Sequence, residues 1–396
     1  MEHIDQVALV KTLLARLDSG TNVDAGGFRK NPTLVYRDPE IAERERQEFF
    51  TNHAQMIGLS GDLPSNNSFV TVNDLSVPIL ATRDDDGNFR AFLNICRHRG
   101  VVLESEPRGS TRRFSCMFHN WTYDSGGALV GVPKEDHFGD IDKSCMGLVE
   151  LPSVERLGML FVHPLVDGVI DVDALLGAEL AAELESWKLD ELRWVDDDAY
   201  DTACNWKLAM DTFGETYHFE VLHKNTLAAN LHGNVQCYDT FGRNHRMVLC
   251  RRDIDAMREL PEDEWDITVA GIPVYWLFPN VQLLPGTQHL QLVRAYPDPN
   301  DPARHISQVS FYVREHVFER GDTQLAEMLQ FMGQRFGEVI RDEDYVASAS
   351  QQRSASSGAM EHVVFGRNEP ALHHYHNTYR SALGMDLLPL VESLSG

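Results

Sequence analysis

The sequence predicts an α+β fold in which a small antiparallel β domain is followed by a larger domain of antiparallel sheet and helices. The chain has 396 residues, 43% hydrophobic and 24% charged, which is enough for two hydrophobic cores. Short β-rich segments begin at Phe69, and helical and strand patterns mix in the second half. We therefore expect an N-terminal helical segment (1–44), a β domain (45–165) and a mixed domain (166–396).

The first predicted elements are a helix and several short strands. Apolar residues from Ile4 to Leu17 recur at helical spacing, which predicts an amphipathic helix within the first twenty residues. The segments FVTV, VPILATR and FRAFLNIC then predict strands of a small antiparallel domain. DDDG (84–87) predicts a hairpin turn between the last two strands.

The second half combines helices with longer strand candidates. Helices are expected near 175–190 and 205–223, and strands in VYWLFPNVQLL, QHLQLVRAYP and HISQVSFYV. A long amphipathic stretch follows, with apolar residues from Leu325 to Ile340 on one face. An antiparallel sheet with helices on one side accommodates this order of elements.

Composition limits the partners of the chain. The net charge of −25 argues against nucleic acid or an anionic membrane as a partner, because both attract clustered lysine and arginine. No apolar run approaches the roughly 18 residues that span a bilayer, and the N-terminus lacks the basic region of a signal peptide, so we expect a cytoplasmic protein without a membrane segment. The six cysteines show no disulfide framework, and a close set of cysteine and histidine is therefore expected to bind metal.

Two short motifs each place one cysteine and one histidine on a tight loop. CRHRG contributes Cys96 and His98, and CMFHNW contributes Cys116 and His119. A structural zinc finger more often supplies a cysteine pair and then a histidine pair, so this order favours a Rieske [2Fe-2S] cluster over zinc. Two thiolates hold one iron of such a cluster and two imidazoles hold the other. We expect the cysteines on one iron and the histidines on the other.

A second set of candidate ligands lies in NWKLAMDTFGETYHFEVLH (205–223). If this segment is helical, Asp211, Glu215 and His218 share one face, and His223 lies about 140° from His218. Both histidines can meet one metal only if the helix ends or bulges there. Two histidines and a distant carboxylate would form the facial triad of a non-haem iron(II) site, but histidines on a mostly apolar helix are more often core or surface residues.

The segment RDEDYVASASQQR (341–353) is the candidate source of the distant carboxylate. Extending the apolar stripe of the preceding helix at about 100° per residue places Glu343 at the centre of the buried face and Asp344 about 100° away. Periodicity alone therefore favours Glu343 as the ligand. A solvated run of charges is the alternative for this segment.

Together these motifs resemble those of the α subunits of Rieske non-haem iron oxygenases, the aromatic-ring-hydroxylating family. CRHRG matches the first cluster loop of that family, while the second loop has Met117 and Asn120 where the family pattern is Cys-Pro-x-His-Gly-Trp. GETYHFEVLH resembles the family's acidic-x-Tyr-His-x4-His motif, which implies His218 and His223 as iron ligands. The family's Glu-Asp pattern implies Asp344 as the third ligand, against the periodicity.

The resemblance also implies roles for two acidic residues and an oligomeric state. Glu215 would bridge His218 in one subunit and the cluster ligand His119 in the next, where the family more often has aspartate. Asp211 would line the iron pocket. Electron transfer between subunits in turn implies a homotrimer or an α3β3 hexamer.

The resemblance covers about residues 40–385 and implies a helix-grip catalytic domain around a largely apolar pocket. The implied reaction is O2-dependent hydroxylation of a small hydrophobic substrate, with cis-dihydroxylation of an aromatic ring favoured and monohydroxylation or N- or O-demethylation as the alternative. A non-catalytic lipid- or steroid-binding protein and a simple electron carrier are the more distant alternatives. The chain has neither a GxGxxG motif after a strand nor plant-type ferredoxin spacing, so it needs a separate electron donor. The resemblance implies that this donor is an NAD(P)H-dependent reductase, with or without a ferredoxin.

Two further features fall outside these motifs. HHYHN (373–377) is assigned to the surface or to a subunit contact, because one helix turn cannot direct all three histidines inward. Arginines between 97 and 113 crowd the cluster loops, and they either steer an acidic electron donor or satisfy local hydrogen bonds.

Overall fold

The computed structural model describes residues 1–319, 321 and 323–393 and divides the chain into two compact units. The larger unit comprises Met1–Arg46, Asp173–Trp187 and Trp194–Gly396. The smaller unit comprises Gln47–Val172 and Lys188–Arg193. Antiparallel sheets and helices make up the fold, so the predicted α+β class is confirmed.

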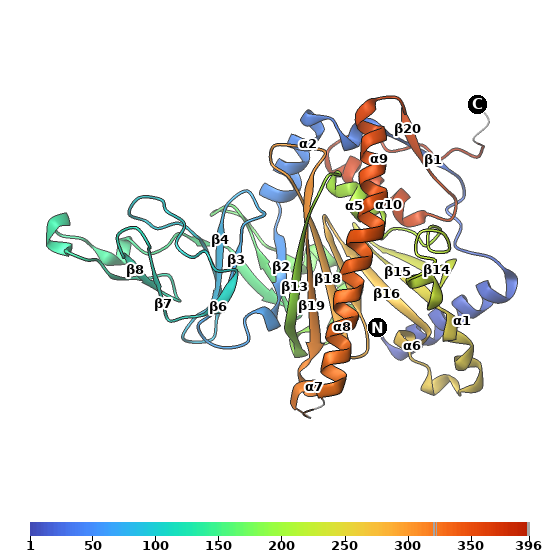
Figure 1. The fold of residues 1–396 in the computed structure, drawn as a ribbon, viewed down its shortest axis with the longest axis horizontal. Helices are drawn as coiled ribbons and strands as arrows, with labels where there is room; N and C mark the ends of the chain where they lie inside the picture. The colour runs from blue at the N-terminus through green and yellow to red at the C-terminus, as the bar shows by residue number, and fades with distance from the viewer. Residues whose placement is uncertain (320, 322, 394–396) are drawn as a thin grey trace. The chain divides into compact units, whose positions relative to one another are not determined.

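The smaller unit is built from three sheets, with strand orders β10-β5-β4-β3-β6, β11-β12-β2 and β7-β8-β9. The predicted hairpin is confirmed, because Arg83 of β4 pairs with Phe89 of β5 and Gly87 has a φ of 85° in the turn between them. The strands, several of which Figure 1 labels, are β2 (Gln55–Leu59), β3 (Ser68–Val72), β4 (Ile79–Arg83), β5 (Phe89–Leu93), β6 (Arg108–Ser110), β7 (Arg113–Ser115), β8 (Thr122–Asp124), β9 (Leu129–Gly131), β10 (Glu150–Leu151), β11 (Ser153–Arg156) and β12 (Met159–Val162).

A seven-stranded sheet of order β13-β19-β18-β17-β16-β15-β14 organises the larger unit. Neighbouring strands from β14 to β19 pair antiparallel. The strands are β13 (Leu192–Thr202), β14 (Leu231–Phe241), β15 (Asn244–Arg251), β16 (Gly271–Leu277), β17 (Val281–Pro285), β18 (His289–Pro297) and β19 (His305–Arg314). A separate pair joins β1 (Arg29–Pro32) to β20 (His362–Phe365).

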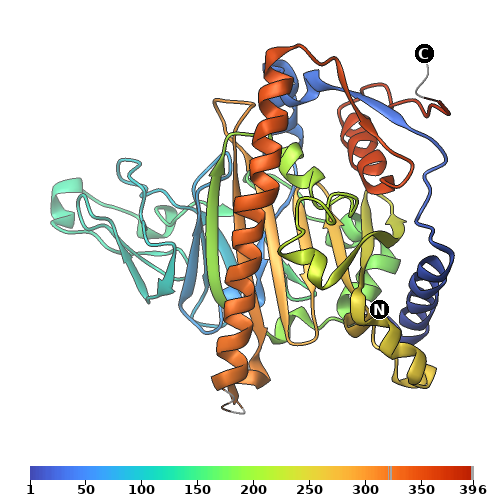
Figure 2. The ribbon, with the colours of Figure 1, turned by 45° about the vertical axis from the view of Figure 1, so that its right-hand side comes forward.

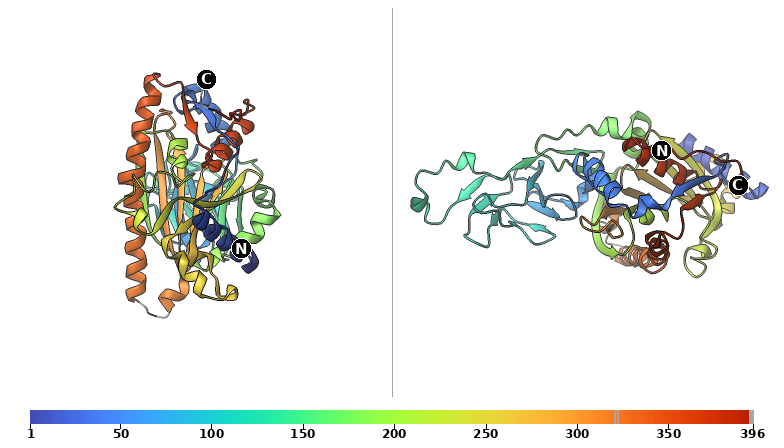
Figure 3. Two further views of the ribbon diagram at one scale, coloured as in Figure 1. Left: turned by 90° about the vertical axis from the view of Figure 1, so that its right-hand side faces the viewer. Right: turned by 90° about the horizontal axis from the view of Figure 1, so that it is seen from above.

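Helices cover both faces of the large sheet, whereas the sequence suggested helices on one side. Alternation along β15 explains the difference, since successive side chains point to opposite faces. Val248 and Cys250 pack with α1 (His3–Ser19) and α6 (Ile267–Ala270), while Met247 and Leu249 share a cluster with Phe336 of α8. The left view of Figure 3 shows α8 on one side of the sheet and α1 on the other.

The long C-terminal helix crosses the sheet in two α-helical parts joined by a π-helical turn. These parts are α8 (Thr323–Val339), the π-turn η10 (Ile340–Asp344) and α9 (Tyr345–Ser357), which form one continuous run in Figure 2. A π-turn inserts an extra residue into the helical hydrogen-bond ladder. The side chains that follow it therefore point in other directions around the helix axis than in a regular α-helix. The run of carboxylates predicted to supply a metal ligand falls within this turn.

The predicted helix over 205–223 is wrong in length. The helix α5 (Trp206–Asp211) has six residues, and turns follow it to residue 226. The Glu215 carboxylate accepts hydrogen bonds from the backbone N–H groups of Tyr217 and His218, and so replaces the bonds a continuing helix would make. Asp211, Glu215 and His218 therefore do not share a helix face.

A buried ion pair fixes the N-terminal segment within the larger unit. Lys207 Nζ lies 2.6 Å from both carboxylate oxygens of Glu45, at the end of α2 (Pro39–Glu45), and the indole of Trp206 donates to the same carboxylate at 3.0 Å. The two charged side chains are only 1% and 3% exposed. Among the described residues, no helix is long and apolar enough to cross a membrane.

Candidate functional site

The two cysteine–histidine loops of the smaller unit have the same backbone hydrogen bonds. In each loop the cysteine N–H donates to the carbonyl five residues later, and its carbonyl accepts from the N–H four residues later, at 2.8–3.0 Å. The residue four positions after the cysteine has a left-handed backbone conformation in both loops, with a φ of 74° at Gly100 and 58° at Asn120. Asparagine tolerates this conformation better than other non-glycine residues, so Asn120 preserves the loop where the family has glycine.

Sulfur and nitrogen donors converge between these two loops. Cys96 and Cys116 are buried and interact with each other through their side chains. The rings of His98 and His119 lie 4.6 Å apart, and both are closer to the surface than the thiols. Two adjacent buried thiols and two adjacent imidazoles match the donor set of a Rieske [2Fe-2S] cluster, with the histidine end facing outward.

Aromatic side chains surround the converging donors. The Trp121 ring stacks on His98 at 4.9 Å, and Tyr123 places its hydroxyl 3.6 Å from the Cys96 sulfur. The same hydroxyl accepts a hydrogen bond from the backbone N–H of Arg97 at 3.0 Å, which orients it. Burial raises the pKa of the Cys96 thiol, and metal binding would offset this by favouring the thiolate.

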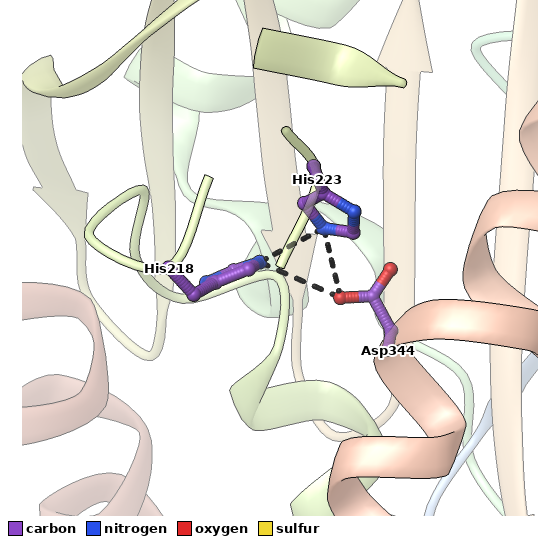
Figure 4. Close-up of side chains that lie close together, drawn as sticks. All are labelled: His218, His223 and Asp344. Carbon is purple, nitrogen blue, oxygen red and sulfur yellow. Dashed lines mark hydrogen bonds and ion pairs between the residues drawn. The ribbon is translucent and has the colours of Figure 1, made fainter. Parts of the chain in front are cut away.

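In the larger unit, His218, His223 and Asp344 each present one potential ligand atom within 4.8 Å of the others. Their side chains point toward one another from the turns after α5 and from the end of the π-turn, as Figure 4 shows. The two histidine Nε2 atoms are 3.1 Å apart, and the Asp344 oxygen lies 3.4 and 3.3 Å from them. Two neutral imidazoles and one carboxylate on one side of a metal make a facial triad.

Two further carboxylates hold the outer nitrogens of these histidines. Glu215 is hydrogen-bonded to Nδ1 of His218, and Glu343 lies 2.6 Å from Nδ1 of His223. The Thr226 hydroxyl donates to the same Glu343 oxygen at 2.8 Å. Each carboxylate fixes the tautomer and the ring orientation in which Nε2 is left for a metal.

The electrostatics of the triad also favour a cation. Burial lowers the pKa of His218, but its hydrogen bonds to Asp344 and Glu215 outweigh burial and raise that pKa to about 9. Burial opposes ionisation of Asp344, yet the two imidazoles hold its pKa below the ordinary value. A divalent ion at the triad would compete with protons for the same three groups.

Asp211 lies in a hydrogen-bonded network beside the triad. His376 Nε2 lies 2.9 Å from one carboxylate oxygen, and the Tyr36 hydroxyl donates to the other at 3.0 Å. Asp211 lines a cavity of about 180 Å³ together with Glu215, His218 and Asp344. The predicted surface position of HHYHN is therefore wrong for His376 and for His373, which are 2% and 6% exposed. The helix α10 (Pro370–Ala382) carries both and packs against the body of the larger unit.

A separate apolar pocket of about 440 Å³ lies between α8 and the sheet. Leu231, Leu249 and Leu284 of the sheet and Phe336 of α8 line it, and they belong to the same hydrophobic cluster as Phe219. The Phe219 ring contacts both histidines of the triad, at 4.9 and 5.4 Å between centroids. Thr226 also lines the pocket and donates to Glu343, the partner of His223, whereas no residue of the triad lines the pocket.

Comparison with known proteins identifies the family. Residues 53–153 match the family model of the Rieske [2Fe-2S] domain, and residues 189–385 match that of the ring hydroxylating alpha subunit (catalytic domain). The chain therefore belongs to the α-subunit family of Rieske non-haem iron oxygenases. The domains of this family imply two cofactors, a Rieske cluster and a mononuclear iron, and the donor sets described above fit both.

Curated relatives match the chain over about half of its length. The α subunit of 2-aminobenzenesulfonate 2,3-dioxygenase from an Alcaligenes species is 32% identical over 48% of this chain and 48% of its own. The oxygenase subunit of glycine betaine monooxygenase from Chromohalobacter salexigens is 30% identical over 51% of this chain and 44% of its own. Dioxygenases and monooxygenases thus both occur among the relatives.

Solved structures share the fold over nearly the whole chain. The quaternary ammonium Rieske monooxygenase CntA superimposes with a TM-score of 0.76 at 20% identity, covering 91% of this chain and 97% of its own. Naphthalene 1,2-dioxygenase from a Rhodococcus species gives a TM-score of 0.72 at 18% identity, and the match covers 95% of this chain and 98% of its own. The helix-grip arrangement implied by the sequence resemblance is confirmed.

The motifs predicted the residues of the triad, the four cluster residues and the contact of Glu215 with His218, but not the other residues that support them. Glu343 was weighed as a ligand and instead contacts the outer nitrogen of His223. No motif predicts the roles of Tyr36 and Thr226, and HHYHN does not indicate that His376 contacts Asp211, because these contacts join residues 117 to 340 positions apart in the chain. No local motif marks such residues in a single sequence.

Proposed function

We propose that the chain is the terminal oxygenase component of a Rieske system that hydroxylates a small hydrophobic substrate with O2. In this proposal His218, His223 and Asp344 hold iron(II), and Cys96, His98, Cys116 and His119 hold the [2Fe-2S] cluster. The observation that carries the proposal is the convergence of the triad, of which His218 and Asp344 line a cavity of about 180 Å³. Phe219 contacts both histidines and belongs to the hydrophobic cluster that lines the apolar pocket of about 440 Å³. His218, His223 and Asp344 would hold iron(II) for reaction with O2, and the four cluster residues would hold the group that supplies electrons singly.

In this proposal, two glutamates orient the iron ligands and the apolar residues bind the substrate. Glu343 and Glu215 would hold the two imidazoles in register with Asp344, since each occupies an Nδ1 position. The leucines and phenylalanines of the pocket would exclude water from the reacting carbon and hold an apolar ring or chain beside the triad. A lipid-binding protein of this fold would have no use for the buried triad.

Cis-dihydroxylation of an aromatic ring is the preferred reaction, because the pocket wall is apolar and includes Phe331 and Phe336. Monohydroxylation, including demethylation, is the second candidate. It is favoured by the 30% identity to a glycine betaine monooxygenase subunit and by the fold shared with CntA. The two reactions differ in the number of oxygen atoms that reach the product.

The products of a substrate panel would test this proposal. Reduced, iron-loaded protein would receive O2 and aromatic acids, polycyclic hydrocarbons, steroids or methylamines, and the products would be identified by mass spectrometry. A diol supports ring dihydroxylation, and a hydroxylated or demethylated product supports the second candidate. Protein that has iron in both sites and makes no product from any compound would contradict the proposal.

The proposed partners are an external electron donor and further copies of the chain. A ferredoxin or an NAD(P)H-dependent reductase would reduce the cluster, and Glu215 would link His218 to the partner subunit's His119 in a homotrimer or α3β3 hexamer. Inter-subunit electron transfer has been described for a quaternary ammonium Rieske monooxygenase of this fold. Exposed apolar side chains beside both sites suit such a contact, with Met117 88% and Tyr217 65% exposed.

Mixed oligomers would test the contact between subunits. Cys116→Ser should lack the cluster and Asp344→Asn should lack the iron, so each variant alone is inactive. Oligomers that contain both variants should regain part of the activity, because an intact cluster then faces an intact iron site in the next subunit. No activity in verified mixed oligomers would contradict electron transfer between subunits.

A further inference from the structure

The charged groups that line the apolar pocket are all cationic in the described part of the chain. Arg251, at the end of β15, and Arg335, on α8, both line it, whereas no aspartate or glutamate does among the described residues. His289 also lines the pocket, but burial and then the nearby Arg251 lower its pKa to about 4, so its imidazole is neutral at pH 7. The pocket therefore presents two permanent positive charges beside a large apolar wall.

Both guanidinium groups are accessible to a ligand. Arg251 Nε lies 3.6 Å from an Asp253 oxygen, and Arg335 pairs with Glu338 on the same helix. The arginine side chains are 34% and 53% exposed, and their carboxylate partners do not line the pocket. Exposed pairs of this kind contribute about 0–1 kcal/mol, so a ligand anion can compete for the same guanidinium donors.

The pocket is connected to the triad along α8 and through Thr226. Arg335 precedes Val339 by one helical turn, about 6 Å along α8, and Val339 lines the same pocket just before the π-turn that carries Asp344. Thr226 lines the pocket as well and is hydrogen-bonded to Glu343, the partner of His223. A ligand in the pocket would therefore contact Thr226, which two hydrogen bonds connect to His223 through Glu343.

We propose that the pocket selects an amphipathic anion, an apolar ring that carries a carboxylate or sulfonate, and that Arg251 and Arg335 bind the anionic group. The proposal rests on the proposed function and names its substrate class. Guanidinium groups offer paired N–H donors that match carboxylate and sulfonate oxygens. A quaternary ammonium compound would meet two like charges and, among the described residues, no carboxylate that lines the pocket, so the same pocket discriminates against cations.

Binding of probes with one shape and different charges would test this proposal. The probes are naphthalene-2-carboxylate, naphthalene-2-sulfonate, the neutral naphthalene-2-carboxamide and the cationic trimethyl-2-naphthylammonium, titrated calorimetrically into anaerobic iron-loaded protein. At least one anion should bind about tenfold more tightly than the amide, and the cation should bind more weakly than the amide. The two anions show which of the two acids the arginines prefer.

Variants of the two arginines provide the second part of the test. Arg251→Gln and Arg335→Gln should each weaken anion binding about tenfold and leave amide binding unchanged, and Arg335→Lys should restore part of the loss. Arg304→Gln is the matched control, because Arg304 is an exposed arginine paired with Asp201 outside the pocket, and it should change nothing. Circular dichroism of each variant would verify folding.

The outcomes separate this proposal from the proposed function. Equal binding of all probes, tighter binding of the cation, or unchanged anion binding in both glutamine variants would overturn the substrate class. If the binding results overturn the anionic substrate class but the protein still oxygenates a neutral or cationic compound, the proposed oxygenase function stands. Selective binding of anions that depends on both arginines, without oxygenation of any compound, would support the anion site and overturn the proposed function.

Discussion

Glu343 lies 2.6 Å from Nδ1 of His223, on the side of the imidazole away from the triad. The next residue, Asp344, approaches Nε2 of the same ring at 3.3 Å. Two consecutive carboxylates can reach opposite nitrogens of one histidine because they lie in the π-turn, where the regular helical phase is broken. This arrangement assigns the two carboxylates different roles. Asp344 lies beside the metal position, and Glu343 supports the ligand His223 from its other nitrogen.

Exchanging each carboxylate for its amide should separate those roles. Asp344→Asn should abolish binding of the mononuclear iron, because a neutral amide replaces the only carboxylate of the triad. Glu343→Gln should retain the site and weaken iron affinity by about ten- to a hundredfold, as is usual when the partner of a ligating histidine is changed. Metal analysis, with the cluster iron counted separately by acid-labile sulfide, measures both. Loss of iron from Glu343→Gln alone would reverse the assignment.

The left-handed conformation of Asn120 predicts how the second cluster loop tolerates substitution. Asn120→Gly should keep the cluster, since glycine adopts a φ of 58° without strain, whereas Asn120→Val should destabilise the loop by about 1–2 kcal/mol and lower cluster occupancy. The visible absorbance of the cluster per chain is the measurement. Cys145→Ser, at an exposed cysteine, should behave as the wild type, and a fully occupied cluster in Asn120→Val would contradict the prediction.

The network around Asp211 should contribute to stability. His376→Leu removes one hydrogen-bonding partner of a largely buried carboxylate and should lower the free energy of unfolding by about 1–3 kcal/mol. Tyr36→Phe removes the second hydrogen-bonding partner of Asp211 with little change of shape, and should lower the free energy of unfolding by about 1 kcal/mol. Urea unfolding of the metal-free variants measures both values. Wild-type stability in both variants would show that Asp211 does not depend on these partners.

The buried pair of Lys207 and Glu45 should be far more sensitive than an exposed one. Lys207→Met leaves a buried carboxylate without its cation and should lower the free energy of unfolding by about 3–5 kcal/mol. Lys11 and Glu262 form the matched exposed pair, with side chains 53% and 56% exposed, and Lys11→Met should change stability by less than about 1 kcal/mol. Similar effects of the two substitutions in urea unfolding would contradict this account.

Glu369 should make stability fall as pH rises. Burial, and then the neighbouring Glu215 and Asp211 carboxylates, raise its pKa to about 7, although a backbone N–H of Gly366 and nearby His218 oppose the shift. The unfolded chain loses this proton near pH 4.5 while the folded chain retains it until about pH 7, so stability is lost between these values. Glu369→Gln should therefore be more stable than the wild type by about 3 kcal/mol at pH 8 and equal to it below pH 4. A difference that does not change with pH would refute the shift.

Local sequence patterns predicted the parts of the fold and site that depend on short-range spacing. The antiparallel strands, the DDDG turn and the amphipathic C-terminal helix follow from such patterns. The motifs also selected the same histidines that the structure brings together near Asp344. The domain boundaries at 45 and 165 stay predictions.

Features that depend on distant contacts could not be predicted in this way. Helical periodicity favoured Glu343, because a regular helix was extended through what is a π-turn. The helix expected over 205–223 ends at Asp211, where a side-chain bond from Glu215 competes with the helical ladder. His376 was placed on the surface because the sequence does not show that α10 is enclosed on several sides.

A single turnover with labelled oxygen tests the central claim most directly. Protein loaded with iron would be reduced chemically, mixed with an anionic naphthalene compound without air, and exposed to ¹⁸O2. The account predicts labelled oxygen in the product together with reoxidation of the cluster, and neither label nor product in Asp344→Asn. Unlabelled compound recovered from wild-type protein with both iron sites filled, over the whole substrate panel, would contradict the assignment of this chain as an oxygenase.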